Sequence, residues 1–68
     1  MKIEYPDIYF GKKIRVFSGE QAITGELYGY DYNSDDDGNE FLEFDVESED
    51  GFLIGFTEKE IDRIEVLP

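Results

Sequence analysis

The stretch Gly25-Glu26-Leu27-Tyr28-Gly29-Tyr30-Asp31-Tyr32 decides the fold of this 68-residue chain. Its side chains alternate with a period of two, which is typical of a β-strand with two different faces. Leu27 and the two glycines share one face with Asp31, whereas Tyr28, Tyr30 and Tyr32 share the other. Glycine inside a strand favours a bend or a bulge. The stretch therefore predicts a long, bent strand over Ala22–Tyr32.

Four further segments show the same alternation, and turns containing glycine, Asn or Asp separate them. They are Lys13–Ser18, Glu40–Glu47, Phe52–Thr57 and Arg63–Leu67. In Phe52–Thr57 the predicted inner face consists of Phe52, Ile54 and Phe56. Together with Ala22–Tyr32 these segments predict five antiparallel strands.

Two short segments carry helix signals. Thr57 and Glu60 have the spacing of a capping box, which predicts one helical or 3₁₀ turn that brings Ile61 to the core. Pro6 is suited to the first position of a second turn that ends at Gly11.

Five short strands cannot bury both faces of an open sheet at this length, and closure removes the exposed edges. The sequence therefore predicts an all-β fold, a small, strongly bent, closed or nearly closed antiparallel barrel, in one domain over residues 1–68. The predicted core consists of inward-facing apolar residues: Ile14, Val16, Leu27, Leu42, Phe44, Val46, Ile54, Ile61, Ile64 and Val66.

The composition excludes several kinds of chemistry, since the chain has no His and no Cys. Ser-His-Asp and Cys-His nucleophile pairs, zinc sites of the usual nitrogen and sulfur type and disulfides all need those residues. Carboxylates such as those of Glu43 and Asp45 are predicted to face solvent, so we expect no catalytic residue, no metal site and no cofactor. No apolar run is long enough to span a membrane or to serve as a signal peptide, which indicates a cytoplasmic protein.

Acidic side chains dominate the charge, with 18 acids against 6 bases and a formal net charge of −12. Every charged residue from Asp31 to Asp50 is acidic. Glu43, Asp45 and Glu47 form the outward face of one predicted strand, which favours either docking of a basic protein or a solvated surface. Self-repulsion among these charges predicts that added salt stabilises the fold.

Nucleic-acid binding requires cations, and only Lys12, Lys13 and Arg15 are clustered, so direct binding is disfavoured. The predicted stripe of Tyr28, Tyr30 and Tyr32 is suited to stacking bases or receiving a peptide, and equally to packing the outer side of the bent strand or a subunit contact.

Residues 33–38 begin like a calcium-binding loop, with oxygen-bearing side chains followed by Gly38. The twelfth position of such a loop needs a bidentate Glu, and Phe44 stands there. A hairpin turn is therefore the favoured interpretation of this segment.

Three segments resemble the Sm and Lsm proteins. Residues 11–16 and 25–33 are similar to the family's first motif, and residues 61–67 are similar to its last strand. The resemblance implies a strongly bent five-stranded barrel that forms rings by pairing its fourth and fifth strands between subunits, often with single-stranded RNA bound. Asp31 and Gly55 match functional positions of the family, whereas Ser34 and Ile54 stand where it has Asn and a base.

We interpret the chain as a non-catalytic interaction module of Sm-like type that associates with itself or binds a basic protein. Its candidate partner-binding residues are Glu43, Asp45, Glu47, Tyr28 and Tyr30. One alternative is an acidic inhibitor that mimics nucleic acid. Another is a divergent RNA-binding ring that uses Lys12, Lys13 and Arg15.

Overall fold

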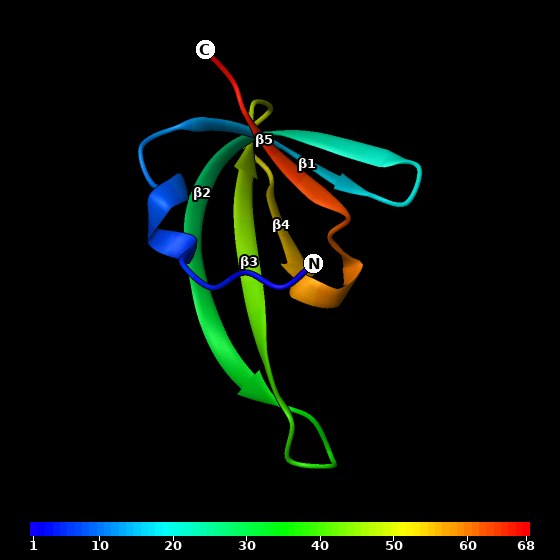
Figure 1. Ribbon diagram of the computed structural model, residues 1–68. Coiled ribbons are helices and arrows are strands. Elements are labelled where there is room, and N and C mark those ends of the chain that lie inside the picture. The colour runs from blue at the N-terminus through cyan, green and yellow to red at the C-terminus, as the bar shows by residue number, and fades with distance from the viewer.

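Five antiparallel strands form one sheet in the computed structural model, which describes residues 1–68 (Figure 1). The elements are η1 (Pro6–Tyr9), β1 (Lys13–Ser18), β2 (Gln21–Ser34), β3 (Glu40–Ser48), β4 (Leu53–Thr57), η2 (Glu58–Glu60) and β5 (Arg63–Val66). The strand order is β4-β3-β2-β1-β5, and η1 and η2 are 3₁₀ turns. The predicted all-β class, the five strands and the two helical turns are confirmed.

The sheet is open, because β4 and β5 lie at its two ends and do not pair with each other. The predicted closure into a barrel is therefore absent from the hydrogen-bonded sheet. The N-terminal segment crosses the curved sheet toward η2 (Figure 1). Its Met1 amino group donates to the carbonyl oxygens of Glu58 and Ile61, at 2.7 and 2.8 Å.

The core lies on the concave side of the sheet and agrees closely with the prediction. Its buried apolar side chains are Ile3, Ile14, Val16, Leu27, Leu42, Phe44, Val46, Phe56 and Ile61. Ile54 and Ile64 are half-buried against it. Val66 was predicted to be inside, but it is 51% exposed because it lies near the end of an edge strand. The sequence pattern missed Ile3, which the N-terminal segment contributes.

A β-bulge between Leu27 and Gly29 corrects the predicted faces of β2. Leu27 pairs with Val46, but Tyr30 then pairs with Phe44, and both partners are buried. Residues directly opposite in an antiparallel pair share a face, so Tyr30 lies on the same side as Leu27. The single tyrosine stripe is therefore wrong: the extra residue, Tyr28, is 63% exposed at the bulge, and Tyr30 packs against the core.

Phe52 also differs from its predicted place in a strand. It lies in the β3–β4 turn and is 68% exposed. Its backbone closes that turn, since its carbonyl accepts from the Ser48 amide at 2.8 Å and its amide donates to Ser48 Oγ at 3.2 Å. The strand begins one residue later, at Leu53.

At Gly25 the backbone of β2 lies close to that of β3. This glycine is buried, and a Cβ atom added there would overlap the carbonyl group of Glu47. Only a residue without a side chain permits this approach. The absence of a side chain at Gly25 thus lets β3 lie close to β2 at the point where Glu26 and Glu47 are cross-strand neighbours.

Candidate interaction surfaces

The outer face of β3 carries the predicted acidic residues on the side away from the core. Glu43, Asp45 and Glu47 alternate with Leu42, Phe44 and Val46, whose side chains are buried. The register places Asp31 of β2 directly opposite Glu43, and Glu26 opposite Glu47. We call these five acids, Glu26, Asp31, Glu43, Asp45 and Glu47, the outer acidic face.

Two like-charged pairs therefore face each other across β2 and β3. Like charges directly opposite in a sheet destabilise it. The nearest base by register is Lys13, opposite Glu26, and its Nζ pairs with Glu49 at 3.2 Å. The outer acidic face consequently presents negative charge that the chain itself does not neutralise.

Asp45 occupies a row without neighbouring side chains, because its cross-strand partners are Gly29 and Gly55. Its Oδ1 lies over Gly55, 3.0 Å from the position that a Cβ would take there. The carboxylate is thus accessible from above between two bare backbone segments, a geometry suited to a cation approaching the face.

The two residues matched by the family resemblance do not come together. Asp31 faces Glu43, whereas Gly55 faces Asp45 on the opposite side of β3. Two strand spacings of roughly 5 Å each separate β2 from β4. Asp31 and Gly55 therefore lie on two different neighbours of β3 and do not line a common base-binding pocket.

Tyr30 belongs to an aromatic cluster with Phe10 and Tyr32. Its ring centroid lies 6.0 Å from each of theirs, and it meets Tyr32 nearly edge to face. Its hydroxyl donates to Asp7 Oδ1 at 2.6 Å. That hydrogen bond, followed by desolvation and the charge of Asp7, raises the pKa of Tyr30. Phe10 and Asp7 were missed because they precede the first strand, outside any periodic segment.

The acidic β2–β3 turn uses one of its carboxylates internally. Asp35 Oδ1 accepts from the amides of Asp37 and Asn39, at 3.0 and 2.9 Å. The hydrogen bond from the Asn39 backbone is the main reason why the pKa of Asp35 is lowered. No three acidic side chains of the structure gather in an arrangement that could hold a metal ion.

The basic cluster is largely engaged within the chain. Besides the Lys13–Glu49 ion pair, Arg15 Nε donates to Thr24 Oγ1 at 2.9 Å. Elsewhere the guanidinium of Arg63 lies 4.1 Å from the ring centroid of Phe17. Only Lys12 of the three predicted RNA-contacting residues has no such side-chain partner.

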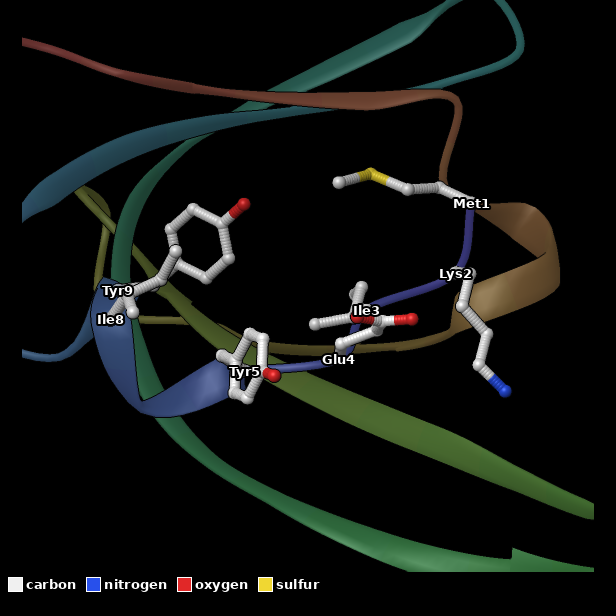
Figure 2. Close-up of a pocket in the computed structure, with 7 residues that line it drawn as sticks. All are labelled: Met1, Lys2, Ile3, Glu4, Tyr5, Ile8 and Tyr9. Atoms are coloured by element: carbon white, nitrogen blue, oxygen red, sulfur yellow. The ribbon is translucent and has the colours of Figure 1, made fainter.

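Several hollows border the N-terminal segment. One, of about 310 Å³, lies between that segment and η1 and is mostly apolar (Figure 2). Figure 2 shows Lys2 pointing away from Tyr9, toward the other side of the segment. There a second hollow of about 290 Å³ is lined by Lys2, Ile3, Glu4, Tyr32, Glu40, Phe41 and Glu58.

Both edges of the sheet are accessible along β4 and β5. The edge strand β4, Leu53-Ile54-Gly55-Phe56-Thr57, contains no charged residue and no proline. Leu53 on β4 and Val66 on β5 are 54% and 51% exposed. Natural sheets usually protect an edge with charge, proline or a covering segment.

Comparison of the chain with protein-family models, with curated proteins and with solved structures gave no match. The structure has no helix with the length and apolar character that crossing a membrane would demand.

Proposed function

We propose that the chain is a non-catalytic interaction module of Sm-like type that assembles by pairing β4 of one copy with β5 of the next. The observation that carries this proposal is the strand order, which leaves those two strands as the edges of the sheet. Pairing between copies would satisfy both edges at once and close the sheet across subunits.

The composition of β4 supports the same assembly, although β5 carries the charged Arg63 and Glu65. More than a third of the chain is charged, yet β4 contains no charge that would discourage a partner strand. The exposed Leu53 and Val66 side chains would lose water contact in such a junction. The family resemblance noted in the sequence implies this pair of strands.

Solution mass measured by light scattering, at about 50 mM and about 500 mM salt, tests the assembly. We expect a closed ring of several subunits, favoured at high salt because each copy carries a charge of −12. Leu53→Glu combined with Val66→Glu should yield monomers. Tyr28→Glu is the matched control, since it also replaces an exposed apolar side chain but lies on β2, away from both edges. A monomer at both salts would refute the proposal.

A basic protein partner on the outer acidic face is the second candidate function. It is favoured by the two like-charged pairs, Asp31 with Glu43 and Glu26 with Glu47, whose repulsion a cationic surface would relieve. A protein of this kind could occupy a nucleic-acid-binding cleft as an inhibitor, as the acidic sequence suggests.

Charge variants separate the candidates. Lysine at Glu43, Asp45 and Glu47 should abolish capture of a basic nucleic-acid-binding protein and should not weaken RNA binding. Alanine at Lys12, Lys13 and Arg15 should do the reverse if the chain is a divergent RNA-binding ring. Capture that survives the lysine substitutions would eliminate the outer acidic face as the docking surface.

A further inference from the structure

The second hollow, which we call the Tyr32 hollow, combines an aromatic ring with carboxylates. The N-terminal segment, the end of β2, the start of β3 and η2 contribute its walls. Tyr32 supplies the ring, Glu4, Glu40 and Glu58 supply the carboxylates, and Phe41 follows Glu40 in the wall formed by β3. Lys2 is the one base among the lining residues.

Tyr32 is exposed although it lies on the core side of β2. It pairs with the buried Leu42, yet it is 58% exposed because β1 pairs with β2 only as far as Glu26 and leaves this part uncovered. Its ring packs edge to face against Tyr30, whose hydroxyl donates a hydrogen bond to Asp7. The hollow thus contains an exposed aromatic surface.

The carboxylates of Glu4 and Glu40 are not engaged within the chain. Neither makes a side-chain hydrogen bond or an ion pair, and Lys2 forms no ion pair with them. Glu58 differs, because its two oxygens accept from the amides of Ile3 and Leu42 at 3.2 Å each. Two free carboxylates therefore stand beside an exposed π surface in a strongly acidic chain.

We propose that the Tyr32 hollow binds the guanidinium group of an arginine from a basic protein segment. A planar guanidinium stacks on an aromatic face and forms paired hydrogen bonds with carboxylates, so it matches both elements of the hollow. The negative charge of the surroundings excludes phosphate and carboxylate ligands by the same electrostatics. This inference does not depend on pairing of β4 with β5, because no residue of either strand lines the hollow. Glu58, which does line it, belongs to η2.

Titration with a hexa-arginine peptide, followed by nuclear magnetic resonance of the labelled full chain, tests the proposal. We expect the largest shift changes at Tyr32, Phe41 and Glu40. Tyr32→Ala should raise the Kd by about 3- to 5-fold, the size of an exposed cation–π contact. Tyr28→Ala, a similarly exposed tyrosine on the same strand, should leave the Kd unchanged.

A pair of double variants controls for net charge. Glu4→Gln with Glu40→Gln should weaken the peptide several-fold more than Glu20→Gln with Glu65→Gln, which removes the same charge elsewhere. Equal losses in both pairs, equal losses for the two tyrosine variants, or shift changes centred on Asp45 would overturn the proposal. Equally tight binding of hexa-lysine at the hollow would overturn its preference for arginine. Repeating the titration on Leu53→Gln with Val66→Gln, which makes both edges polar without adding charge, separates this result from assembly, because the Kd should not change.

Discussion

The two halves of β2 differ in what holds them. The first half, Gln21–Glu26, pairs with β1 throughout, and at Gly25 it is pressed against the backbone of β3. The second half, Leu27–Ser34, pairs with β3 alone and exposes Tyr28 and Tyr32. The first half thus has the backbone of β1 along its whole length, whereas the second half has the backbone of β3 on one side and, in addition, the contacts of Tyr30 with Asp7 and Phe10. The Tyr32 side chain is consequently exposed on the half of β2 that β1 does not reach, whereas the sheet edges suited to assembly lie on β4 and β5.

The glycines of the two halves provide the strongest test of this difference. Gly25→Ala should cost about 3 kcal/mol or more and could prevent folding, because its Cβ would overlap the carbonyl group of Glu47. Gly29→Ala should leave the free energy of unfolding unchanged or raise it by up to about 1 kcal/mol. The added Cβ would have no neighbouring atom within 4 Å, and the φ angle of Gly29 is not positive. Urea unfolding followed by circular dichroism measures both. Similar losses for the two variants would contradict the comparison.

Substitution of Glu58 should have the next largest effect on stability, because this residue hydrogen-bonds both the N-terminal segment and β3. Its carboxylate accepts from the amides of Ile3 and Leu42. Glu58→Gln removes the charge and one acceptor, so we expect a loss of about 1–2 kcal/mol in the free energy of unfolding. Glu65→Gln is the control, since its single ion pair with Arg63 is exposed and 3.7 Å long. Faster hydrogen exchange at Leu42 in the Glu58 variant alone would confirm the hydrogen bond.

The sequence pattern also predicts the first half of β2 and its neighbours better than the second half. Period-two alternation identified β1 with its exact ends and most of β3, because each has one apolar and one polar face. The glycines of β2 predicted a bend or a bulge, and a bulge lies between Leu27 and Gly29. The alternation was nevertheless continued through it, so every side chain after the bulge was assigned to the wrong face. The outer acidic face was predictable from β3 alone. The Tyr32 hollow was not, because it joins Glu4 to Glu40 through a contact between distant segments.

Repulsion on the outer acidic face gives a smaller effect of opposite sign. Glu43→Gln relieves its contact with Asp31, so we expect stabilisation of about 0.5 kcal/mol at low salt. Added salt should raise the stability of the unaltered chain and shrink the gain from the substitution. Glu20→Gln in the β1–β2 turn removes one charge without a cross-strand partner and should gain less. Thermal melts at two salt concentrations measure this, and equal gains for the two variants would exclude a specific pair effect.

The smallest expected effect concerns the side-chain bond that supports the second half of β2. Asp7 accepts a hydrogen bond from Tyr30 and so raises the tyrosine's pKa above its ordinary value of 10.0. A pKa raised on folding means that the folded chain holds the proton more tightly than the unfolded chain. The associated stability is therefore complete below pH 10 and is lost as the pH rises through the folded-state pKa. Unfolding measured from pH 8 to 11.5 should decline more steeply for the unaltered chain than for Tyr30→Phe, whereas Tyr28→Phe should follow the unaltered chain. Parallel curves for all three would show that the second half of β2 does not depend on this bond.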